Sequence, residues 1–214
     1  MWVDWKEAFK NRRFSISFIL AVLVVAGFII SLPYFFNEIL LPKPGIRLND
    51  PVLLAFPPKD WSIEVFLILY AVTITSLSLN IKKPGTILLL FQVYGVVNFL
   101  RMTTLYLFTL EAPEGIIPLA DPVLAVLAYG KEVFVKDLFF SGHISSLFIL
   151  FLIERRKIYA RIVLISTIVL ALFLAWQRVH YTLDMLAAPV VAWLVYRFFT
   201  WFNPTLGILP AKGS

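Results

Sequence analysis

The sequence predicts an all-α, multi-pass membrane protein, and this prediction depends on its composition and on the length of its apolar runs. The chain has 214 residues, of which 60% are hydrophobic and 15% are charged. A water-soluble domain of this length could not bury so much apolar surface, whereas a bilayer accepts it. One helical domain over residues 1–214 fits this length. The chain has no cysteine, which excludes disulfides, thiol nucleophiles and thiolate metal sites.

Six apolar runs, each near the ~20 residues that a helix needs to cross the hydrocarbon core, predict six transmembrane helices. The fourth run is the shortest and begins with polar residues, so we expect it to start at the membrane interface. A basic segment, residues 1–13, precedes the first run, and a tail, residues 203–214, follows the last. The predicted spans are Phe14–Phe35, Trp61–Leu79, Thr86–Phe108, Leu138–Ile153, Ile158–Trp176 and Tyr181–Phe202.

The charge pattern predicts the orientation of these spans. A net charge of +6 would suggest nucleic-acid binding in a soluble protein, but in a membrane protein Lys and Arg collect in short cytoplasmic loops. With the N-terminus inside, 12 of the 19 Lys and Arg residues fall on the cytoplasmic side. We therefore expect both termini in the cytoplasm and no nucleic-acid partner. The two long connections, Pro42–Asp60 and Glu111–Asp137, are expected on the outer side.

The chain has two histidines, and the six-span topology brings both to the outer mouth of the helix bundle. His143 opens the fourth predicted helix and His180 opens the sixth. Asp184 follows His180 by four residues, so on a helix the two side chains share one face. The carboxylate of Asp184 can accept a hydrogen bond from one ring nitrogen of His180, which leaves the other nitrogen to attack phosphorus or move a proton. The alternative for Asp184 is a charge that extends to the membrane interface.

The residues before His143 favour a bound phosphate. Ser141 and Gly142 begin the fourth helix, where free backbone N–H groups and the helix dipole attract an anion. His143 would then lie where it can protonate a leaving alkoxide. Ser141 also fits an ordinary helix N-cap, which is compatible with the same role. Asp137 either orients His143 or is a solvated loop acid.

Three further charged residues are candidates for the same site. Arg101 follows the apolar part of the third span, and a membrane arginine costs ~2.5–3.5 kcal/mol at mid-helix. A two-point contact with a lipid phosphate would offset that cost, and extension of the side chain to the interface is the alternative. Arg178 is a second candidate phosphate ligand. Glu64, in the second span, is a candidate additional acid.

At these residues the chain resembles the sphingomyelin synthase family, a branch related to the type-2 phosphatidic acid phosphatases. One motif of that family has the form D-x3-S-G-H-T. This chain matches it at Asp137, Ser141, Gly142 and His143, with Ile144 in place of Thr.

A second family motif begins H-Y-T-x-D-V, and the chain matches it from His180 to Asp184, with Met185 in place of Val. The stretch Arg101–Pro113 looks like a weaker version of the arginine-bearing motif of the family's third span. The phosphatase branch usually carries a K-x6-R-P motif, and no Arg-Pro dipeptide occurs in this sequence. The synthase branch is therefore favoured.

The resemblance implies an enzyme that moves a phospho-headgroup from a glycerophospholipid to ceramide or diacylglycerol, with no metal and no cofactor. It implies that His180, held by Asp184, attacks phosphorus and forms a phosphohistidine. His143 would protonate the leaving diacylglycerol and then accept the proton of the second lipid's hydroxyl. The expected phosphate contacts are Arg101, Ser141, Gly142, Arg178 and Tyr181.

Three alternatives stay open at this point. A lipid phosphate phosphatase would use the same two histidines with water as the acceptor. A haem-b electron carrier would use His143 and His180 as axial ligands, although Asp184 and the Ser-Gly pair make better sense around a phosphate. A non-catalytic lipid carrier would need neither histidine.

Overall fold

The computed structural model describes residues 4–55, 57–120 and 136–209. This part of the chain is helical apart from its connections and a bridge between Ile46 and Leu110, which confirms the expected all-α class. The helices are α1 (Trp5–Lys10), α2 (Arg12–Tyr34), the π-helix η1 (Phe35–Leu40), α3 (Pro51–Leu54), α4 (Ser62–Asn80), α5 (Pro84–Leu107), α7 (Gly142–Ile153), α8 (Lys157–Trp176) and α9 (Thr182–Thr205).

Five helical segments in the described part are long and apolar enough to cross a membrane. They are α2 with its extension η1, α4, α5, α8 and α9, and each corresponds to a predicted span with ends that differ by a few residues. Many large apolar side chains lie on their surfaces, and Ile30 on α2 is 78% exposed. Contact with lipid explains such exposure, so the helices support a multi-pass membrane protein.

The fourth predicted span differs from the expectation. Its helix, α7, has 12 residues and begins at Gly142, so it is about 18 Å long and shorter than the ~30 Å hydrocarbon core. The four residues from Leu138 to Ser141 precede the helix without regular secondary structure, with bends at Phe139 and Phe140. Among the described residues, five candidate spans are therefore confirmed as long apolar helices, and the fourth predicted span is a short apolar helix that does not confirm a sixth.

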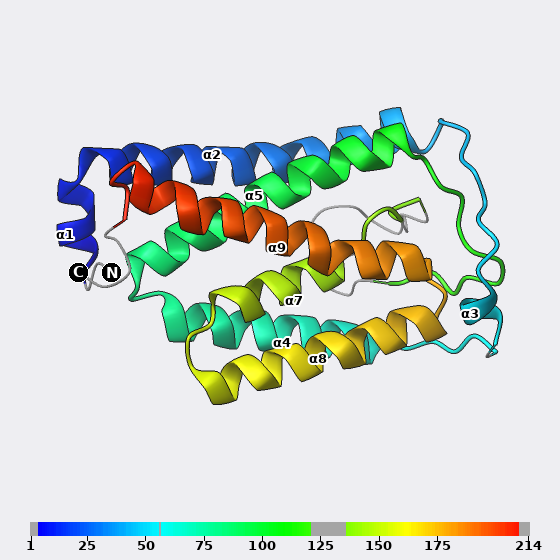
Figure 1. Cartoon of the computed structure of the whole chain (residues 1–214). Coiled ribbons are helices and arrows are strands. Elements are labelled where there is room, and N and C mark those ends of the chain that lie inside the picture. The colour runs from blue at the N-terminus through cyan, green and yellow to red at the C-terminus, as the bar shows by residue number, and fades with distance from the viewer. Residues whose placement is uncertain (1–3, 56, 121–135, 210–214) are drawn as a thin grey trace.

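Helix α7 lies inside the bundle (Figure 1). It contacts α4, α5, α8 and α9, and its side chains form much of the largest apolar core. Helix α2 packs along α5 on the other side of the molecule. A short helix can lie at the centre because its longer neighbours cover its apolar side chains. The surrounding helices therefore hold His143, in the first turn of α7, in a fixed position.

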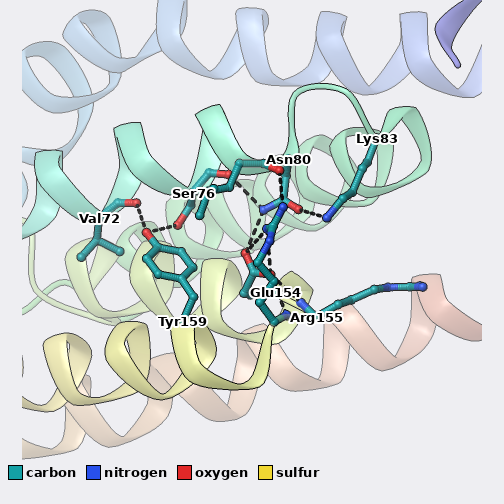
Figure 2. Close-up of polar contacts among 9 residues, drawn as sticks. Val72, Ser76, Asn80, Lys83, Glu154, Arg155 and Tyr159 are labelled. Atoms are coloured by element: carbon teal, nitrogen blue, oxygen red, sulfur yellow. Dashed lines mark hydrogen bonds and ion pairs between the residues drawn. The ribbon is translucent and has the colours of Figure 1, made fainter. Parts of the chain in front are cut away.

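The C-terminal end of α7 is held by a buried carboxylate (Figure 2). The Glu154 side chain is fully buried and accepts hydrogen bonds from the backbone N–H groups of Arg155 and Arg156, both at 2.8 Å. It also accepts one from Asn80 Nδ2 at 3.0 Å, which joins the end of α4 to the turn between α7 and α8. This cluster therefore fixes the end of α7 that lies away from His143.

The two ends of the bundle differ. Helix α1 and the end of α9 lie together, and Asn11 Nδ2 donates to the carbonyl of Gly207 at 3.0 Å. The opposite end carries α3 and the connections that follow η1 and α5 (Figure 1). Both histidine-bearing segments, the start of α7 and the connection from α8 to α9, are directed toward this second end.

Candidate active site

The two histidines lie side by side. His143 is in the first turn of α7, and His180 is in the connection between α8 and α9. Their ring centroids are 6.1 Å apart, with the ring planes inclined by 63°. The backbone N–H of Ser141 donates to the carbonyl of Asp184 at 3.3 Å, which ties the start of α7 to the first turn of α9. This contact sets the spacing of the two imidazoles.

A backbone carbonyl fixes the tautomer of His180. Its Nδ1 lies 3.1 Å from the carbonyl oxygen of Leu138. A carbonyl oxygen only accepts hydrogen bonds, so Nδ1 must carry the proton of the neutral ring. Nε2 is then the unprotonated nitrogen with a lone pair. The geometry therefore leaves His180 with the ring nitrogen that a nucleophile or a base requires.

Burial keeps this ring neutral. His180 is 1% exposed, and burial is the main reason that its pKa falls from the usual 6.5 to about 3. The positive charge of Arg101 lowers the pKa further, while the hydrogen bond to Leu138 opposes the shift. A neutral imidazole at physiological pH is the form that can attack an electrophile.

Asp184 does not make the hydrogen bond to His180 that we expected. Its Oδ2 lies 3.7 Å from Nδ1 of His180, beyond hydrogen-bond distance, and accepts instead from the backbone N–H of Tyr181 at 3.1 Å. The reason is that His180 precedes α9, so the one-turn helical spacing does not apply to the pair. Its Oδ1 has no hydrogen-bond partner in the described part of the chain. Asp184 therefore holds the backbone at the start of α9, while Leu138 orients the ring of His180.

Arg101 lies against the start of α7. The side chain is 6% exposed, and its Nε donates to the carbonyl of Phe140 at 3.0 Å. A Cβ atom added at Gly142 would lie 3.0 Å from Cζ of Arg101. Gly142 is therefore the residue type that lets the guanidinium approach the N-terminus of α7, a structural role that the motif alone did not reveal.

Asp137 pairs with Arg101 in the structure. Its Oδ1 forms a hydrogen-bonded ion pair with Nη2 of Arg101, and Thr104 Oγ1 binds the neighbouring carbonyl of Phe139 at 3.1 Å. The two contacts anchor the segment before α7 to α5. The contact assigns Asp137 to Arg101 rather than to His143, which replaces both of the roles considered from the sequence.

Ser141 is the N-cap of α7. Its hydroxyl accepts a hydrogen bond from the N–H of Ile144 at 3.4 Å, and the residue is fully buried. The ordinary capping role is therefore present. Because the cap occupies this hydroxyl, backbone N–H groups of α7 and the guanidinium of Arg101 are the better candidates for binding an anion.

Arg178 and Tyr181 hold the two long connections of the chain, the one before α4 and the one after α5. Arg178 donates from Nε to the carbonyl of Leu53 at 3.1 Å and from Nη1 to that of Glu114 at 2.9 Å. The hydroxyl of Tyr181 donates to the carbonyl of Glu111 at 2.9 Å. These contacts connect both long connections to the segment that carries His180, so we assign the two residues to packing rather than to phosphate binding.

Asp50 and Phe66 belong to the site region but were not singled out from the sequence. Asp50 Oδ2 accepts from the N–H of Thr182 at 2.7 Å, so a residue 132 positions away caps the start of α9. Phe66 on α4 contacts the ring of His143, with centroids 6.0 Å apart. Neither contact has a local sequence signal, because each depends on how the helices and connections meet. Glu64 is exposed in the first turn of α4, where an acidic side chain interacts favourably with the helix dipole.

Metal ligation has no candidate in the described residues, where no three His, Asp or Glu side chains gather around one point.

No protein-family model matches the chain, and no curated protein sequence matches it.

Proposed function

We propose that the protein is a membrane phosphotransferase that moves a phospho-headgroup from a glycerophospholipid to the hydroxyl of ceramide or diacylglycerol. The observation that carries this proposal is the pairing of His143 and His180, 6.1 Å apart, beside the buried guanidinium of Arg101. One ring has a fixed tautomer with an available nitrogen, and a buried positive charge lies near it. This combination suits attack on the phosphorus of an anionic diester.

In the proposed first step, Nε2 of His180 forms a bond to phosphorus as the bond from phosphorus to the diacylglycerol oxygen breaks. Protonated His143 gives its proton to that oxygen. The product is a phosphohistidine that carries the headgroup, and Arg101 with the N-terminus of α7 balances the charge on its oxygens. Arg101 is paired with Asp137, so a phosphate that binds Arg101 competes with this carboxylate.

In the second step, the hydroxyl of the acceptor lipid gives its proton to His143 and its oxygen attacks phosphorus. The bond between phosphorus and Nε2 breaks, which restores neutral His180 and protonated His143. Burial of His180 by the described residues supports a lipid acceptor over water, because a site with poor access to water disfavours hydrolysis. We place this site on the extracytoplasmic side, on the basis of the charge distribution of the loops.

The test is an acceptor assay with purified protein in detergent. Fluorescent ceramide, then fluorescent diacylglycerol, is offered with a mixture of choline, ethanolamine and inositol phospholipids, and products are identified by mass. We expect a new phospho-lipid with the wild type and none with His180→Ala. A donor labelled with ³²P should leave an acid-labile label on His180 that His180→Ala lacks.

Two results would contradict the proposal. Release of only water-soluble phosphate or phospho-headgroup would identify a hydrolase that uses the same histidines. Undiminished transfer by His180→Ala would remove the phosphohistidine mechanism, whatever the acceptor.

A further inference from the structure

An apolar cavity lies between four helices, below the two histidines. Its volume is about 320 Å³, and residues from α2, α4, α5 and α7 line it. Six of its lining residues carry this argument: Tyr70, Thr73, Leu77, Tyr94, Ser146 and Leu150. None of the described residues that line it is charged. Because α2, α4 and α5 are candidate membrane spans, the cavity lies within the part of the protein that we expect inside the bilayer.

Helix periodicity connects this cavity to the candidate active site. On α7, Ser146 and Leu150 follow His143 by three and seven residues, so the three side chains share one face. On α5, Tyr94 precedes Arg101 by seven residues, so these two side chains also share one face of their helix. The cavity therefore begins about one turn below His143.

The aromatic side chains of α4 extend the same connection. Phe66 contacts His143, and Phe66 stacks on Tyr70 with ring centroids 5.8 Å apart. Tyr70 and Thr73 then line the cavity. Thr73 lies roughly 16 Å along the axis of α4 from its first residue, Ser62, which is about half the thickness of a hydrocarbon core.

We infer that this cavity binds one hydrocarbon chain of the lipid whose phosphate lies at His143, His180 and Arg101. The inference rests on the proposed function and names where the substrate's chain is held. A lipid with its phosphate beside Arg101 has its ester and chain directed toward the bilayer centre, and the cavity offers uncharged walls along that path. The hydroxyl of Ser146 donates to the carbonyl of Gly142 at 2.7 Å, so its hydrogen bond is made within α7 and it tolerates an apolar occupant.

The test compares two neighbouring residues of α4. Thr73→Trp places an indole in the cavity, whereas Ile74→Trp places it on the outer surface, where Ile74 is 64% exposed. The probe is phosphatidylcholine with a diazirine at the middle of one chain, in vesicles of phosphatidylcholine and phosphatidylethanolamine. Adducts are mapped by peptide mass spectrometry after illumination.

We expect adducts on the lining residues of α4, α5 and α7 in the wild type and in Ile74→Trp, and their loss in Thr73→Trp. In Thr73→Trp, the ratio of transfer from a dipalmitoyl donor to transfer from a dioctanoyl donor should fall about tenfold below the wild-type ratio. A loss of this size is expected when about two methylene groups lose apolar contact. If Thr73→Trp does not yield a monodisperse protein, Leu77→Trp, about one turn further along the cavity, replaces it.

Three outcomes would overturn the inference. The first is that the lining residues are labelled as strongly in Thr73→Trp as in the wild type. The second is labelling at Phe108, Phe139 and Leu183, which line a separate cavity of about 520 Å³ near the outer connections. The third is cross-linking between protein chains through α4, which would show that a second copy covers the cavity. Labelling needs no turnover, so a labelled cavity without transfer contradicts the function alone, and transfer with an unlabelled cavity contradicts the inference alone.

Discussion

Nδ1 of His180 lies 3.1 Å from the carbonyl oxygen of Leu138, four residues before the start of α7. A main-chain oxygen therefore determines which ring nitrogen of the candidate nucleophile carries the proton. A side-chain replacement at Leu138 leaves this carbonyl in place. The segment that presents this carbonyl is itself held by α5, through Arg101 on Phe140 and Thr104 on Phe139. The state of His180 thus depends on the packing of α5 against the start of α7.

Gly142 provides a test of this packing. Gly142→Ala introduces a Cβ atom 3.0 Å from Cζ of Arg101, so the guanidinium must move away from the start of α7. We expect transfer to fall about tenfold or more, which corresponds to about 1.4 kcal/mol of lost transition-state stabilisation. Initial rates measured at saturating donor would show the loss.

Gly27→Ala on α2 is the matched control, because a Cβ atom there meets nothing within 4 Å. It should leave the rate unchanged and stabilise the helix by up to about 1 kcal/mol. Equal rates in Gly142→Ala and the wild type would mean that the position of Arg101 does not matter for transfer.

Acid should destabilise the protein through His180. Its pKa is about 3 in the folded protein and 6.5 ordinarily, so between these values the unfolded state binds more protons than the folded state. The stabilisation is complete above pH 6.5 and is lost as the pH falls toward 3. At pH 5 the loss is about 2 kcal/mol for this one group.

The measurement is the melting temperature of the detergent-solubilised protein at pH 7 and pH 5. In His180→Gln, which has no group that titrates in this range at that position, the decrease between the two pH values should be smaller than in the wild type. An equal decrease in both proteins would show that other groups govern acid stability.

Tyr181 provides a test of water exclusion. Its hydroxyl donates to the carbonyl of Glu111 and accepts from the N–H of Leu48, so it joins the two long connections beside His180. Tyr181→Phe removes both bonds at a cost of about 1 kcal/mol each. If these connections limit the access of water, the ratio of hydrolysis to transfer should rise several-fold.

The ratio is measured as free phospho-headgroup against phospho-lipid product from one donor. Thr205→Val, at the far end of α9, removes a hydroxyl that bonds only to its own helix at Trp201 and should leave the ratio unchanged. A constant ratio in Tyr181→Phe would show that these bonds do not control water.

A reciprocal amide pair joins α5 and α9 in the apolar interior. Asn203 Nδ2 donates to Gln92 Oε1 at 2.7 Å, and Gln92 Nε2 donates to Asn203 Oδ1 at 3.2 Å. Asn203→Leu leaves Gln92 without its partner, which should cost about 1–3 kcal/mol of stability. The double variant Gln92→Leu with Asn203→Leu should recover much of that loss, because both polar groups are then gone.

Unfolding in a denaturing detergent measures this coupling as a double-mutant cycle. Additive losses in the two single variants and the double variant would show that the two amides act independently.

The helical class and five of the six apolar spans could be predicted from the sequence. Long apolar runs are local properties, and a helix is the structure that satisfies backbone polar groups inside a bilayer. The ends of α4, α5, α8 and α9 agree with their predicted spans within a few residues for that reason. The fourth span is not confirmed at its predicted length, because burial among neighbouring helices, which has no local signal, allows a 12-residue helix at the centre.

By itself, the sequence determined most of the helices of this protein and which titratable residues stand near their ends, His143 and His180 among them. Only the tertiary structure decided their partners: Leu138 for His180, Asp137 for Arg101 and backbone carbonyls for Arg178. Hydrophobic periodicity depends on neighbours along one helix, so it can be read in the chain. A hydrogen bond to a carbonyl 42 residues away depends on how helices pack, and no residue type encodes it locally.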